Sequence, residues 1–150
     1  MTTYVHAIWC DDIRMELGNK PSFMGVYTGG IVVPALPTVL PKLCVYAWVV
    51  SPVESPASIS CIRVVRDDGS LVAEVKPEHP TASLGADPSP QREGATRKVV
   101  MAGLGLGSVE FPANCRYLTL MVDTAAGSLE GPKLHVDVSP SLTAQVIEGE

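Results

Sequence analysis

The sequence predicts an all-β protein, an antiparallel β-sandwich of the immunoglobulin-like type with about nine or ten short strands and no substantial helix. Three observations support this fold class. Apolar residues recur with a period of two along most of the chain, the period of an amphipathic helix is nearly missing, and turn residues separate the apolar stretches at short intervals. A chain of 150 residues also fits one domain. We therefore expect residues 1–150 to form a single sandwich domain.

Two hairpins are predicted from turn residues that lie between strand-like stretches. Met15–Leu17 and Ser22–Thr28 flank a Gly-Asn-Lys-Pro turn. Ser58–Arg66 and Leu71–Lys76 flank an Asp-Asp-Gly-Ser turn, and an Asp-Gly pair between β-branched runs is a strong hairpin signal. Each pair of stretches should therefore form two neighbouring antiparallel strands.

An apolar run that contains three prolines, Ile31–Leu43, follows the first hairpin. Pro34, Pro37 and Pro41 exclude a helix interior and a central strand, which leaves extended or polyproline-like backbone. The run must still be buried, so it either crosses the protein's own core or docks as an arm on another chain. It leads into Leu43–Val50, which is apolar on both faces as a doubly covered central strand is, and this position favours the crossover. In the docking alternative, the partner-binding residues are Val33, Leu36, Val39 and Leu40.

The C-terminal half should contain a long loop followed by further strands. Pro77–Gly94 carries four prolines and is predicted to be a surface loop. Thr96–Met101 is a predicted strand, Gly103–Gly107 a predicted flexible turn, and a short strand leads into Phe111. The glycines do not form a dinucleotide-binding loop, because that loop needs a helix directly after it. Two strands with clear alternation close the chain, Arg116–Asp123 and Lys133–Val138.

Charge and hydropathy exclude several classes of partner. The net charge is −5 and basic residues are not clustered, which argues against nucleic-acid binding. The longest apolar run, Leu43–Val50, is far shorter than the roughly 20 residues of a membrane span, and the N-terminus lacks the pattern of a secretory signal. The sequence thus predicts a soluble intracellular protein without a membrane partner. Only 18% of residues are charged, which favours a protein partner or a homo-oligomer.

The cysteines and the acidic residues near the N-terminus are the strongest candidates for chemistry. Cys10, Cys44, Cys61 and Cys115 lack the spacing of a zinc site, so we expect free buried thiols. An alternative metal site would combine Asp11, Asp12 and Glu16 with Cys10 and His6. Adjacent aspartates on extended backbone point to opposite faces, however, and a turn with a salt bridge to Arg14 is the favoured interpretation.

No other constellation points to catalysis. His6, His79 and His135 lack metal-ligand spacing, and no nucleophile elbow is present. An enzyme that uses Asp11, Asp12 and a histidine is the least favoured of the possible functions. The sequence therefore predicts a non-enzyme without catalytic residues, cofactors, cofactor-binding residues or metal ligands. The few aromatic residues are spread singly along the strands, which favours core packing over base stacking.

The N-terminal third carries a string of short motifs: Cys10-Asp11-Asp12-Ile13-Arg14, Gly18-x-Lys20, Gly25-Val26-Tyr27 and Leu40-Pro41-Lys42-Leu43. In combination they resemble the signature of an uncharacterised family of small β-sandwich proteins that bacteria and some of their phages encode. This resemblance implies a compact sandwich and a phage or prophage origin, and it supplies no catalytic residues. The later motif Phe111-Pro112-x-x-Cys115-Arg116-Tyr117 is similar to the strand entry of many immunoglobulin-like sandwiches.

Two functions are carried forward. The first is a non-enzymatic structural or interaction module, such as a decoration protein or a minor capsid-associated protein of a phage particle. Such a protein would be cytoplasmic when made and part of the virion if phage-encoded. The alternative is a small-molecule-binding or regulatory domain of the bacterial cytoplasm, with a pocket formed by Pro77–Gly94 and Gly103–Gly107 at the rim of the sandwich.

Overall fold

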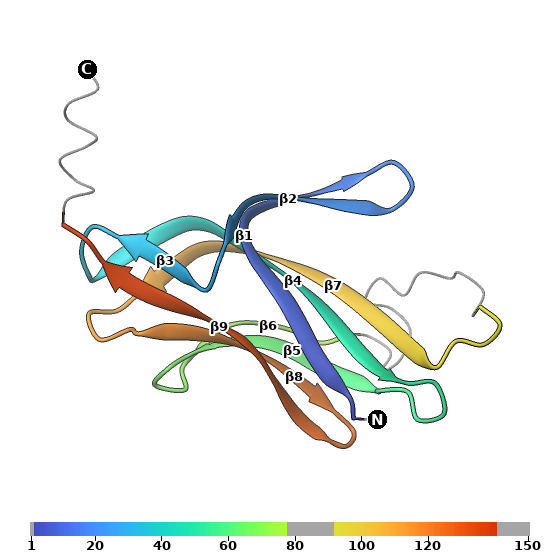
Figure 1. The fold of residues 1–150 in the computed structure, drawn as a ribbon. Coiled ribbons are helices and arrows are strands. Elements are labelled where there is room, and N and C mark those ends of the chain that lie inside the picture. The colour runs from blue at the N-terminus through green and yellow to red at the C-terminus, as the bar shows by residue number, and fades with distance from the viewer. Residues whose placement is uncertain (1, 78–91, 141–150) are drawn as a thin grey trace.

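The computed structural model describes residues 2–77 and 92–140, in which nine strands form two packed sheets without a helix (Figure 1). This confirms the predicted all-β sandwich. The strands are β1 (Tyr4–Glu16), β2 (Lys20–Tyr27), β3 (Gly30–Val33), β4 (Thr38–Pro52), β5 (Ile59–Arg66), β6 (Leu71–Val75), β7 (Arg97–Phe111), β8 (Tyr117–Thr124) and β9 (Gly127–Val138). No helix in these residues is long and apolar enough to cross a membrane.

The two sheets have the strand orders β2-β1-β4-β7 and β3-β9-β8-β5-β6. β4 pairs with β7, and β5, β8 and β9 are neighbours in the other sheet, which matches the B–E and C–F–G pairings of immunoglobulin-like sandwiches. Every pairing is antiparallel except that of β3 with β9, which is parallel. The predicted antiparallel sandwich thus contains one parallel pair, at the edge where the chain passes between the sheets.

The core lies between the sheets and is built from the inward-facing residues of both. Leu43, Ile62, Phe111, Leu118 and Leu134 are fully buried, and burying one such side chain stabilises the fold by roughly 1.5–3 kcal/mol. Period-two alternation along each strand places these residues on one face. The apolar face of each sheet is thus covered by the other sheet.

The Pro-rich run crosses from one sheet to the other. Ile31 and Val33 pair with β9 and lie in the core, with exposed fractions of 4% and 5%. The chain then turns and enters the first sheet as β4. More of the run forms β-strand than its prolines predicted. Pro41 is tolerated within β4 because β1 pairs with β4 only from Cys44 onwards, so the segment before it is paired on one side alone.

β7 is one continuous strand, and the turn predicted at Gly103–Gly107 is wrong. Ala102, Leu104 and Leu106 alternate with the glycines and are buried in the core. This period of two keeps the backbone extended and paired with β4 throughout. The glycines therefore lie on the outer face of the first sheet, where they leave that face of β7 without side chains.

Both predicted hairpins are confirmed, by the β1–β2 pairing and the β5–β6 pairing. β1 pairs with β4 as far as Cys10 and continues beyond it with β2 alone. The β1–β2 hairpin projects over the outer face of β4 and β7 (Figure 1). There the Phe23 ring packs against the rings of Tyr46 and Trp48, at centroid distances of 5.3 and 5.9 Å. β4 is thus covered on both faces, as its apolar sequence predicted.

Candidate functional site

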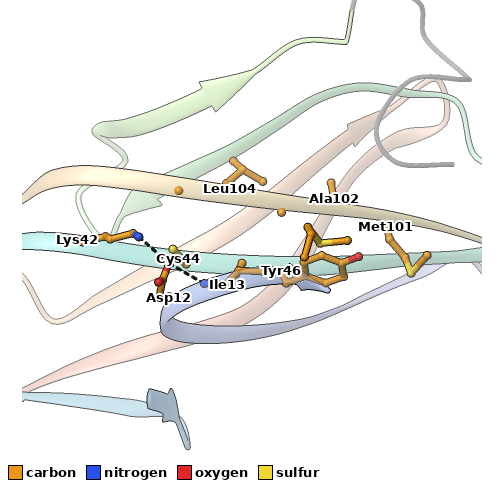
Figure 2. Close-up of a pocket in the computed structure, with 11 residues that line it drawn as sticks. Asp12, Ile13, Lys42, Cys44, Tyr46, Met101, Ala102 and Leu104 are labelled. Atoms are coloured by element: carbon orange, nitrogen blue, oxygen red, sulfur yellow. Dashed lines mark hydrogen bonds and ion pairs between the residues drawn. The ribbon is translucent and has the colours of Figure 1, made fainter. Parts of the chain in front are cut away.

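A groove of about 490 Å³ lies between the β1–β2 hairpin and the outer face of β4 and β7 (Figure 2). Its walls are mostly apolar: Ile13 and Met15 from the hairpin, Tyr46 from β4 and Met101 from β7. The volume is within the range of roughly 300–1,000 Å³ that is typical of ligand sites in proteins. The groove therefore has the size and the lining to accept an apolar group.

Two glycines of β7 create the space in this groove. A Cβ atom added at Gly103 would lie 3.1 Å from Tyr46 Cδ2, so the aromatic ring rests directly on that backbone. At Gly105 no heavy atom lies within 4 Å of an added Cβ atom. Gly103 therefore admits the tyrosine ring, and Gly105 keeps the neighbouring floor of the groove open.

An ion pair closes one end of the groove. Lys42 Nζ lies 2.6 Å from Asp12 Oδ1, which also accepts a hydrogen bond from the Ile13 backbone N–H at 2.9 Å (Figure 2). The hydrogen bond from Lys42 lowers the pKa of the Asp12 carboxyl, and the same contact raises the pKa of Lys42. The salt bridge of Asp12 was expected to involve Arg14, but its partner is Lys42. β1 leaves β4 at this point, so that Lys42 faces the base of the hairpin.

Asp11, the neighbour of Asp12, forms a contact on the other side of the hairpin base. The Tyr27 hydroxyl donates a hydrogen bond to Asp11, and burial together with this carboxylate raises the pKa of Tyr27. Gly25 has φ +63°, and an added Cβ atom would overlap the Asp11 carboxylate. Asp11 and Asp12 thus turn to different partners, as expected for adjacent residues on extended backbone. Three of the four motifs that carry the N-terminal resemblance contribute to this base, and the fourth, Gly18-x-Lys20, lies at the turn of the hairpin.

Within residues 2–77 and 92–140, no strand pairs with the outer edge of β7, which borders the groove. Val72 and Ala73 of β6 lie across a hollow from the C-terminal half of this edge. The stretch from Val99 to Val109 contains no charged residue and no proline. Natural sheets usually protect an edge of this length with such residues, because exposed N–H and C=O groups template further strands. The open stretch ends at Glu110, whose carbonyl accepts a hydrogen bond of 3.0 Å from Arg66 Nε.

Aromatic rings gather on the same outer face. Tyr46 and Trp48 lie 4.8 Å apart, the His6 ring lies 5.7 Å from Trp48, and Phe23 packs on both from the hairpin. They come from three separate stretches of the sequence, and Phe23, Tyr46 and Trp48 were expected in the core. The available signal was the i, i+2 spacing of Tyr46 and Trp48, which places both on one face of a strand.

The predicted partner-binding residues are divided between core and surface. Val33 is buried, and Leu36 and Leu40 are partly buried against the core. Val39 has an exposed fraction of 55%. Of the four, Val39 is therefore the one that a partner can reach most easily.

The histidines and cysteines do not form a reactive centre in the described residues. His135 packs against Tyr117 at 5.9 Å, and His79 lies outside the described residues, as does most of the predicted loop Pro77–Gly94. No group of three or more potential metal ligands occurs in the part of the chain that the structure describes. The four cysteines are free and buried as expected, and burial raises the pKa of Cys10 to about 11. Such thiols remain protonated at neutral pH.

Comparisons with known proteins returned no match. No protein-family model, no curated protein and no solved structure matches this chain. The N-terminal resemblance therefore stays a prediction, and the groove and the adjoining edge are the features that indicate a function.

Proposed function

We propose that this protein is a non-enzymatic interaction module that binds an extended protein segment along the open edge of β7. The observation that carries this proposal is the stretch from Val99 to Val109, a long edge without charge or proline. In strand addition, main-chain hydrogen bonds supply affinity, while pockets beside the edge select side chains. The edge and the groove of this protein offer both elements side by side.

The groove supplies the specificity. A segment paired with β7 directs every second side chain toward the outer face, on which the groove lies. An apolar side chain entering it would contact Met101 of β7, the Tyr46 ring of β4 and Met15 of the hairpin. Methionine and tyrosine suit such a role, because thioether and aromatic groups are enriched at protein interfaces. The preferred segment is therefore extended and apolar at alternate positions.

The finer form of the proposal is a decoration or minor capsid-associated protein of a phage particle, cytoplasmic when made. The N-terminal resemblance and the low fraction of charged residues support it. A small-molecule-binding domain is the second candidate, favoured by the volume of the groove. This groove is lined by Gly103 and Gly105, which were expected in a ligand pocket, whereas most of the other expected wall, Pro77–Gly94, lies outside the described residues.

The test pans a random peptide display library on the protein and measures the affinity of selected peptides for two variants. Gly105→Leu and Gly107→Leu are matched, because neither glycine has a left-handed φ and neither has a heavy atom within 4 Å of an added Cβ atom. Gly105 lines the groove and Gly107 does not. We expect Gly105→Leu to weaken binding about tenfold or more, equivalent to about 1.4 kcal/mol, and Gly107→Leu to retain it.

Two results would contradict the proposal. Selected peptides that bind both variants equally would remove the groove from recognition. A library that yields no binder, together with saturable binding of the apolar dye 8-anilinonaphthalene-1-sulfonate that Gly105→Leu abolishes, would favour the small-molecule candidate instead.

A further inference from the structure

We infer that the segment that occupies the edge of β7 is β7 of a second copy of this chain, paired antiparallel about a two-fold axis. This inference rests on the proposed function and names its partner. Identical antiparallel strands pair in an isologous way, so that a dimer closes and both edges are covered at once. The two four-stranded sheets would become one continuous sheet across the interface.

The ends of β7 carry opposite charges. Arg97 and Lys98 precede the uncharged stretch, and Glu110 follows it. A pairing centred on Leu104 places Leu104 opposite its own copy and Lys98 opposite Glu110 of the second copy, because both lie six residues from the centre. Arg97 and Lys98 of each copy then lie at the same end of the interface as Glu110 of the other. Opposite charges on one face of a strand pair stabilise it.

The backbone of β7 supports the same arrangement. Burial alternates along the strand until Ser108, whose φ of +52° shifts the alternation by one residue, so that Val109 and Phe111 face the core. This shift turns Glu110 to the outer face, where Arg97 donates a hydrogen bond to the Tyr4 hydroxyl. Arg97 and Glu110 of the second copy therefore lie on the same face of the joined sheet.

Apolar surface beside the edge would also be covered. Val99 has an exposed fraction of 45%, and Met101 is half-buried on the same face. Between these residues and Ser108 the strand carries no charge that a second copy would oppose. The edge is thus self-complementary along its uncharged centre and at both ends.

The test is sedimentation velocity of the full chain over a range of concentrations at low salt. The wild type should form a reversible dimer. Glu110→Lys places like charges together at both ends of the interface, and we expect it to weaken the dimer about tenfold or more. Adding Arg97→Glu and Lys98→Glu to that variant exchanges the signs and should restore the dimer. Glu16→Lys makes the same charge change in the hairpin and should leave the dimer unchanged.

A wild type that stays monomeric at all concentrations would overturn the second-copy inference. So would a dimer that Glu110→Lys and Glu16→Lys affect equally, since the charges at the ends of β7 would then have no specific role. The peptide experiment keeps the two proposals apart. Peptide binding that depends on Gly105 in a monomeric protein would retain the proposed function and reject the second copy, whereas failure of both experiments rejects both.

Discussion

Replacing Val33 by aspartate tests whether the Pro-rich run is part of the core. Val33 lies in β3 with an exposed fraction of 5%, whereas its neighbour Val32 has an exposed fraction of 51%. Val33→Asp removes a buried apolar side chain, a loss of roughly 2 kcal/mol, and adds the cost of a carboxyl group without a partner, several kcal/mol more. The total approaches the roughly 5–15 kcal/mol that stabilises a typical domain. Val32→Asp should cost less than about 1 kcal/mol.

Urea denaturation followed by tryptophan fluorescence measures both variants under the same conditions. We expect Val33→Asp to be unfolded, or to unfold at a much lower urea concentration, and Val32→Asp to follow the wild type closely. The reasoning is refuted if Val33→Asp retains the stability of the wild type and loses only its assembly. That result would make the run a docking arm instead of a crossover.

Three further predictions concern the groove, an ion pair and the thiols. Gly103→Val should lower the free energy of unfolding by about 1–3 kcal/mol, because the valine side chain would meet the Tyr46 ring. Gly105→Val should be neutral or should stabilise the fold by up to about 1 kcal/mol, and urea denaturation can measure both variants. Asp123→Asn should cost about 1–2 kcal/mol at pH 7, since it removes the negative charge and one of the two oxygens that accept the hydrogen bonds of 2.9 and 3.1 Å from Arg63. Because Arg63 lowers the pKa of Asp123 below its usual 3.8, the advantage of the wild type over this variant should shrink as the pH falls below that value, which denaturation at pH 3 and pH 7 would reveal. In mass spectrometry after iodoacetamide treatment at pH 8, all four cysteines should be unmodified in the folded protein and alkylated in urea, and rapid alkylation of the folded protein would contradict their burial.

The fold class and both hairpins could be predicted because they depend on local patterns. An Asp-Gly turn between β-branched runs and a period of two specify neighbouring strands directly. Gly103–Gly107 was misinterpreted, because glycine is a turn residue in isolation. Here Leu104 and Leu106 maintain the alternation, and the long pairing with β4 keeps the glycines extended. Tertiary pairing outweighed the local preference.

The groove could not be predicted from the sequence, because three distant segments form it. Asp12 and Lys42 meet only where β1 diverges from β4, and Tyr46 rests on Gly103 only because β4 pairs with β7. The local sequence carries no mark of the place where one strand leaves another. The prolines of the run are a second example. Pro41 excludes a strand that is paired on both sides, but it is compatible with this part of β4, which is paired on one side only.

Residue-resolved amide exchange along β7 shows whether the edge of this strand is free to accept a partner. In an antiparallel pair, alternate amides point toward the partner strand and the others point away from it. At a concentration at which sedimentation shows a monomer, every second amide between Val99 and Val109 should exchange quickly while its neighbours are protected by β4. Protection of the fast set should appear as the dimer forms or a selected peptide binds. If both sets exchange equally slowly in the monomer, the edge is already covered within the chain and the proposed interaction site is wrong.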